Sequence, residues 1–207
     1  MPEQEDKLFA ALAVIGFRST PKPPRPRLAT LPPQARAAIL DLYRELGGTH
    51  PEPRLAPGAW DSCLESDLIV EYDEGQHFNR YRAKTLDPDW AMDLPWRRDY
   101  LGYCDEFEED CLKSRGWGGY WSNDSAERMF GAARPARDLT GPGSPRWKQR
   151  ALYDAMRDIA AAHGIVRLAR LAAYDDVGGI TLSRALDRPA LLDRDALRAL
   201  IAARTIG

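Results

Sequence analysis

Hydrophobic and polar positions alternate with two different periods along the chain. Apolar residues recur at helical spacing in four segments, namely residues 4–17, 33–46, 145–163 and 193–203. Short continuous apolar runs at 68–72 and 165–173 predict strands instead. Ser144 and Pro145 are typical of a helix cap and a first helical position. The order helix, hairpin, irregular segment, helix, strand, helix predicts an α/β fold with a mixed sheet flanked by helices.

Two segments interrupt this pattern. Prolines at 21–27 forbid a helix and favour an extended spacer or surface strap. Residues 78–145 keep no sustained period and are rich in aromatic side chains. We therefore expect an N-terminal helix and Pro-rich segment over 1–32, and one domain over 33–207 with an aromatic-rich insertion at about 78–145. The aromatic residues of that insertion could stack on bases or form the core of a small module: Trp90, Trp96, Tyr100, Tyr103, Phe107, Trp117, Tyr120 and Trp121.

The segment 60–77 reads as a β-hairpin that gathers carboxylates. If residues 65–67 form a three-residue turn, Asp61 stands opposite Glu71, and the two-residue period places Asp73 on the same face. The other face is expected to be a core face, made of Trp60, Leu64, Leu68, Val70 and Tyr72. A register slip of one residue would move Asp61 to the wrong face.

Opposed carboxylates repel unless a proton or a cation lies between them. A few carboxylates without Cys or His suit Mg²⁺, which keeps several waters and takes other ligands from substrate phosphates. The hairpin therefore predicts a Mg²⁺ (or Mn²⁺) site for phosphodiester cleavage, held by Asp61, Glu71 and Asp73, with the backbone carbonyl of Tyr72 completing the protein's share. The alternative is a solvent-facing hairpin edge that carries acids.

Length, net charge and cysteine content limit the classes of protein to which the chain can belong. The chain has 207 residues, a net charge of −2 and three cysteines, so it fits one core of moderate size with reduced thiols and does not fit a protein that coats nucleic acid non-specifically. No apolar run approaches 18 residues, and we expect a cytoplasmic protein without a membrane span. A basic stretch at 128–150 could meet phosphates or be a solvated helix approach.

The order of these elements resembles the PD-(D/E)XK nuclease superfamily, whose restriction-endonuclease-like core is a helix, three antiparallel strands, a crossover helix and a fourth strand. Gly58-Ala59-Trp60-Asp61 resembles the glycine-led strand with the first catalytic Asp in RecB-like members. Glu71-Tyr72-Asp73 stands at the acid-x-lysine motif. Gln149 to Tyr153 resembles the Gln-x-x-x-Tyr motif of that subgroup. The resemblance covers roughly residues 35–77 and 144–186.

The run from Val70 to His77 is also similar to the Glu-x-Asp-Gly-x-x-His pattern of nucleases related to very-short-patch repair endonucleases. Asp73 departs from the superfamily pattern, because most members have Lys there. The departure leaves Asp73 as a further metal ligand, with His77 or Arg80 supplying the proton transfer or positive charge. Loss of catalysis with the fold retained is the alternative.

These arguments define the predicted site residues. The expected catalytic set is Asp61, Glu71, Asp73, His77, Gln149 and Tyr153, and the expected contacts to nucleic acid are Arg80, Arg146, Lys148 and Arg150. The resemblance implies a divalent-metal-dependent nuclease acting on DNA, in restriction, repair or defence, where the superfamily is common. A catalytically silent member that binds nucleic acid or a protein partner is a second hypothesis. A glycosidase using the paired acids is a third and weaker one.

Overall fold

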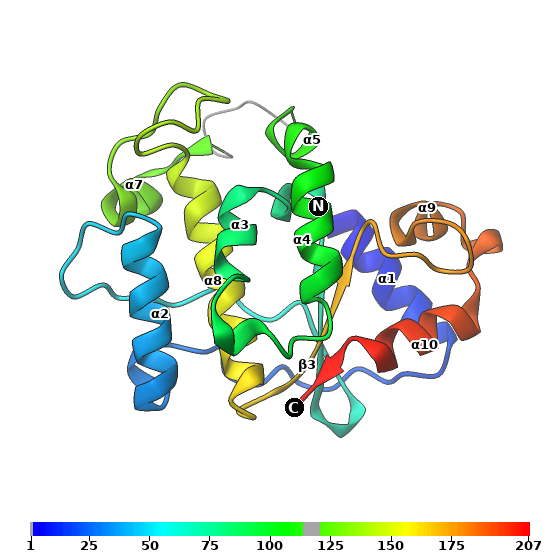
Figure 1. The fold of residues 1–207 in the computed structure, drawn as a ribbon. Helices are drawn as coiled ribbons and strands as arrows, with labels where there is room; N and C mark the ends of the chain where they lie inside the picture. The colour runs from blue at the N-terminus through cyan, green and yellow to red at the C-terminus, as the bar shows by residue number, and fades with distance from the viewer. Residues whose placement is uncertain (1, 114–120) are drawn as a thin grey trace.

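A single mixed sheet lies at the centre of the computed structural model, which describes residues 2–113 and 121–207. Four strands of the described residues form it in the order β1 (Ser62–Leu64), β2 (Leu68–Asp73), β3 (Arg167–Ala172) and β4 (Thr205–Ile206). β2 runs antiparallel to β1 and parallel to β3, and β4 runs antiparallel to β3. The predicted mixed α/β sheet flanked by helices is confirmed (Figure 1).

The hairpin has the predicted register. Ser62 pairs with Val70, and the turn spans Glu65–Asp67. Ser66 and Asp67 adopt φ values of 60° and 55°, the left-handed conformation that a tight turn needs. Trp60 is a correction, because it packs with Ile69 rather than on the opposite face with Leu64. It precedes β1, so the two-residue period does not extend to it.

A short extended segment continues the sheet beyond β1. Ser19 forms an antiparallel bridge with Leu64. The backbone N–H of Thr20 donates to the Cys63 carbonyl at 2.8 Å, and that of Glu65 donates to the Arg18 carbonyl at 2.9 Å. This edge segment follows the first helix directly, so β1 has a neighbour on each side.

Helices near the two ends of the chain cover one face of the sheet. They are α1 (Pro2–Val14), α9 (Leu182–Asp187) and α10 (Arg194–Ala203). Leu8 and Leu12 of α1 pack with Val70 of β2 and Leu171 of β3 in one apolar cluster. The N-terminal helix is therefore part of the same core as the sheet.

The other α-helices of the described residues lie on the opposite face or beyond it (Figure 1). They are α2 (Pro33–Glu45), α3 (Arg80–Thr85), α4 (Arg97–Glu106), α5 (Glu108–Lys113), α7 (Asp124–Phe130) and α8 (Pro145–Ala162). The long helix α8 contacts α2, α3 and α7 and connects to β3. Ser144 caps it as predicted, since the Trp147 N–H donates to Ser144 Oγ. No helix in the described ranges has both the length and the apolar character to cross a membrane.

The first part of the segment 78–145, from Phe78 to Cys104, packs into the same apolar cluster as one face of the sheet. Phe78, Trp96 and Tyr100 contact the Ile69 side of β2, and each is fully buried. These aromatic side chains form core and do not offer faces to bases. Trp117 and Tyr120 lie outside the described residues. All three cysteines, Cys63, Cys104 and Cys111, are buried.

Candidate metal and phosphate site

Asp61 and Glu71, two of the predicted metal ligands, lie together near the open end of the hairpin, opposite its turn. The Tyr72 N–H donates to Asp61 Oδ2 at 3.0 Å, and the Asp61 N–H donates to Glu71 Oε1 at 3.0 Å. Asp61 lies just before β1, which keeps it opposite Glu71. Both residues line a pocket of about 240 Å³, whose other lining residues are Glu5, Tyr72, Glu74, His77, Arg150 and Arg157.

The charged forms of both acids are disfavoured. Burial, together with the nearby Asp61, raises the pKa of Glu71 to about 8, although Arg157 acts in the opposite direction. Burial also raises the pKa of Asp61. Glu71 is only 2 % exposed. A pair formed by a buried and a half-buried carboxyl group takes up either a proton or a cation.

Asp73 belongs to a different environment. Arg170 Nη1 donates to Asp73 Oδ1 at 2.6 Å, and the Tyr100 hydroxyl donates to Asp73 Oδ2 at 2.7 Å. Burial works against ionisation, but Arg170 and His77 keep the pKa of Asp73 below its usual value. The structure thus separates Asp73 from the pocket of Asp61 and Glu71, because Arg170 on the neighbouring strand already neutralises it.

His77 lies between these two environments. It ends the short turn Gly75–His77 after β2, and its Nδ1 is 2.8 Å from Asp154 Oδ2 and 3.1 Å from Asp73 Oδ1. The pKa of Asp154 is held well below its usual value, since His77 and Arg170 outweigh its burial. A proton on Nδ1 directed at these carboxylates leaves Nε2 as the acceptor nitrogen.

One face of α8 supplies the rest of the charges. Arg150, Asp154, Arg157 and Asp158 follow helical spacing toward the sheet. Arg157 Nε is 3.3 Å from Glu71 Oε2, and its Nη2 donates to the Ala59 carbonyl at 2.9 Å. Arg157 therefore links the pocket to the loop that precedes β1.

Behind the pocket lies a fully buried set of ion pairs. Arg170 Nε donates to Asp158 Oδ1 at 2.7 Å. Arg82 Nη2 forms an ion pair with Asp158 Oδ2 at 2.7 Å, but the geometry of this contact is not that of a hydrogen bond. Asp73, His77 and Asp154 also offer ligand atoms within 4.8 Å of one another, close enough to hold a metal ion. Arg170 and Tyr100 already engage Asp73, so the pocket of Asp61 and Glu71 is the better place for an added cation.

Comparison with known proteins places this arrangement in a family. A family model matches residues 41–188, which is well over half of the chain. The chain belongs to the family described as Family of unknown function (DUF7255). No curated protein and no solved structure matches it. The DUF7255 span contains the hairpin, α8 and β3, whereas α1 with Glu5 lies outside it.

Gln149 and Tyr153 lie within the DUF7255 span but not at the site. Gln149 Nε2 donates to Ser125 Oγ at 3.1 Å, and the Tyr153 hydroxyl approaches the sulfur of Met129 at 3.7 Å. Both therefore face α7, which corrects the expectation that they point toward the carboxylates. They sit one residue away from Arg150 and Asp154, and one residue turns a helix by about 100°.

The residues predicted to bind nucleic acid also separate. Lys148 is buried, with Nζ 5.5 Å from the centre of the Tyr81 ring. Arg80 forms a two-pronged pair with Glu108, and Arg146 donates to Gln149. Only Arg150 of this set lines the pocket.

Sequence reasoning missed Asp154, Arg157 and Arg170. The signal that could have found them was present in the printed sequence. Asp154, Arg157 and Asp158 put three charges among the apolar positions of a helix, and Arg170 interrupts a strand-like run. Charges at such positions are buried only with partners, and so they predict complementary charges on neighbouring elements.

Proposed function

We propose that the protein is a divalent-metal-dependent nuclease that hydrolyses phosphodiester bonds of DNA. The observation that carries the proposal is that the half-buried Asp61 and the buried Glu71 share one pocket, in which partial or full burial raises the pKa of both. Two oxygen donors whose negative charges lack full compensation fit a hard cation such as Mg²⁺ or Mn²⁺. Asp73 does not belong to this ligand set.

The connectivity supports membership of the PD-(D/E)XK superfamily. The chain forms α1, the edge segment at Ser19, β1, β2, the crossover helix α8 and the parallel strand β3 in this order, with α2 inserted before β1 and several helices inserted between β2 and α8. This order is similar to a helix, three antiparallel strands, a crossover helix and a fourth strand. The position of His77 agrees with the pattern related to very-short-patch repair endonucleases. The places of Gln149 and Tyr153 give no support to the RecB-like motif.

Five residues that line the pocket have a role in this proposal, together with Asp154, which contacts His77. Asp61 and Glu71 would hold the metal, which would supply Lewis-acid activation of a phosphate and its attacking water. Asp154 orients His77, so that Nε2 can accept the proton of that water. Arg150 and Arg157 line the same pocket and would bind the phosphate oxygens.

A catalytically silent nuclease fold that still binds nucleic acid is the second candidate. One contact favours it, because Arg157 lies 3.3 Å from Glu71 and supplies part of the positive charge that a metal would bring. The same protein would then bind DNA without cutting it.

Metal titration and DNA cleavage together test the proposal. We expect the chelator-treated protein to bind Mn²⁺ in calorimetry and to cleave labelled single- or double-stranded DNA when Mn²⁺ or Mg²⁺ is present. Asp61→Asn and Glu71→Gln should lose both properties. Asp67→Asn is the matched control, since Asp67 is an exposed acid in the turn of the same hairpin.

Each outcome has a separate meaning. Metal binding without cleavage, by a protein that still binds DNA, would support the silent member. Cleavage that persists in chelator, or that survives Glu71→Gln, would refute the metal site.

A further inference from the structure

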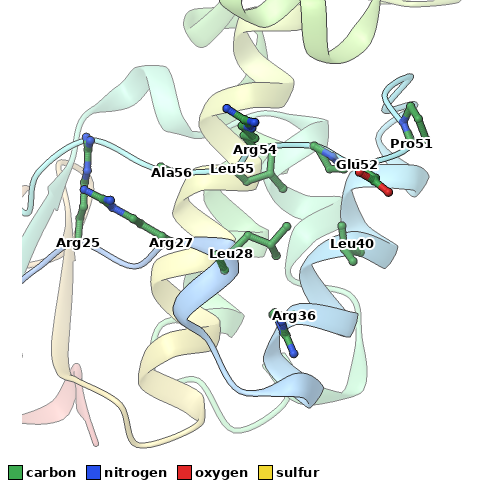
Figure 2. A pocket seen from close by; sticks show the side chains of 12 residues that line it. Arg25, Arg27, Leu28, Arg36, Leu40, Pro51, Glu52, Arg54, Leu55 and Ala56 are labelled. Carbon is green, nitrogen blue, oxygen red and sulfur yellow. The ribbon is translucent and has the colours of Figure 1, made fainter.

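A large basic hollow lies away from the carboxylate pocket. It has a volume of about 820 Å³ and lies between the extended segment around Arg27, helix α2 and the loop 51–56. In the view of Figure 2, Arg36 of α2 and Arg54 of the loop stand at opposite borders, with leucine side chains between them. We call this hollow the arginine groove, and its lining includes Arg25, Arg27, Arg36, Arg54, Leu28 and Leu55.

The charge of the groove is strongly one-sided. Four guanidinium groups share it with a single carboxylate, that of Glu52. All four arginines are exposed. Arg25 donates to the Pro57 carbonyl at 3.1 Å. Within the described part of the chain, none of the four lies in an ion pair. Arg44 of α2 differs from them, because it pairs with Asp41 at 2.8 Å.

The basic surface continues beyond the groove. A neighbouring hollow of about 460 Å³ shares Glu52, Pro53, Arg54 and Leu55 with it and adds Arg128 of α7. Cationic side chains are thus distributed along an elongated surface that reaches α7. A small anion is held by groups that converge on one point, whereas spaced guanidinium groups suit phosphates that repeat along a chain.

One loop joins the groove to the proposed cleavage site. The loop runs from Arg54 to Asp61, and its carbonyls are held at Pro57 by Arg25 and at Ala59 by Arg157. A polymer with repeating phosphates that is bound in the groove can follow this loop to the carboxylate pocket.

We propose that the arginine groove binds the sugar–phosphate backbone of a nucleic acid strand on its way to the carboxylate pocket. The path to the pocket rests on the proposed function, whereas binding in the groove needs no metal and no catalysis. Guanidinium groups bind the phosphates, and the half-buried Leu28 and Leu40 contact sugars and base edges. No base-specific reading is built into such a surface, so binding is independent of sequence and sensitive to salt.

Fluorescence anisotropy in chelator tests the groove without any cleavage. The probes are labelled single-stranded and duplex DNA of the same sequence, titrated at several salt concentrations. The double variant Arg36→Gln/Arg54→Gln should weaken binding by tenfold or more and lower the salt slope by about 1.4 to 1.8, the release expected for two phosphate contacts. The control Arg44→Gln/Arg188→Gln removes the same charge from exposed positions outside the groove and should change affinity less than threefold.

Several results would overturn the inference. Equal losses in the two double variants would show an effect of net charge alone, and absence of binding by the unmodified chain would exclude the site. Competition by poly-glutamate as strong as that by unlabelled DNA of equal charge would assign the groove to acidic polypeptides. DNA binding and DNA cleavage, measured on the same proteins, separate the two proposals. If the natural protein binds DNA through the groove arginines but does not cleave it, only the nuclease is refuted. If the natural protein cleaves DNA and the groove variants bind and cleave it equally well, only the groove is refuted.

Discussion

Replacing Glu71 with Gln should stabilise the metal-free protein. The folded-state pKa of Glu71 is about 8 against an ordinary value of 4.5. Near neutral pH the folded protein therefore retains a proton that the unfolded chain has already released. Linkage gives a penalty of about 1 kcal/mol at pH 5 and about 3 kcal/mol at pH 7. The raised pKa means that this part of stability is lost as pH rises from 4.5 toward 8. Glu71→Gln removes the penalty, and about 3 kcal/mol is the upper limit of the gain at pH 7.

Urea unfolding in chelator at pH 5 and pH 7 measures the effect. We expect Glu71→Gln to exceed the natural protein by up to about 3 kcal/mol at pH 7 and by about 1 kcal/mol at pH 5. A variant less stable than the natural protein at both pH values would refute the reasoning and identify Glu71 as a structural, hydrogen-bonded acid.

Asp73→Asn is the matched control on the same strand, with the opposite expected sign. Asp73 has a depressed pKa and a fully buried partner in Arg170, so the ionised form stabilises the fold. Removing one partner of a buried pair destabilises a protein by about 3–5 kcal/mol. The contribution of Asp73 is present above its unfolded pKa and disappears as pH falls, so the difference between Asp73→Asn and the natural protein should shrink in acid. A loss that stays constant down to pH 3 would contradict this assignment.

Two further predictions concern residues that the sequence alone placed wrongly or not at all. Asp154→Asn should lower DNA cleavage about 100-fold or more while leaving Mn²⁺ affinity within threefold, because Asp154 positions His77 and does not line the metal pocket; an equal loss of metal affinity in calorimetry would count against this role. Lys148→Met should leave DNA affinity within twofold in anisotropy, since Lys148 is buried over the rings of Tyr81 and Phe130; a tenfold loss would restore it as a phosphate contact.

The hairpin could be predicted because local rules determine it. A turn of three residues and the two-residue period of a strand fix which residue stands opposite Glu71, and no long-range information is needed. The start of α8 was equally legible, since Ser144 and Pro145 act within a single turn. The structure brings the side chains of Asp61 and Glu71 to one pocket, as predicted. Their role as metal ligands stays a prediction.

The partners of Asp73 could not be predicted in the same way. Arg170 lies 97 residues further along the chain and reaches Asp73 only through the parallel pairing of β2 with β3. Short helices between 78 and 145 showed no period because residues on several of their sides are buried against different clusters. The basic stretch at 128–150 allowed either phosphate contacts or a solvated helix approach, but its Lys148 is buried. The extended segment predicted to be a spacer or a surface strap contributes Arg25 and Arg27 to the groove.

The pairing of β2 with β3 also has a kinetic consequence. Leu68 is aligned with Arg167, so the centre of the sheet closes only after the long intervening segment has been placed. Closure of so long a loop is entropically expensive, and topologies of this kind fold slowly. Until β3 arrives, Asp73 and Asp154 lack the guanidinium of Arg170. A folding intermediate that contained the hairpin and α8 alone would therefore keep these acids hydrated, and complete dehydration of the interior would be among the last events of folding.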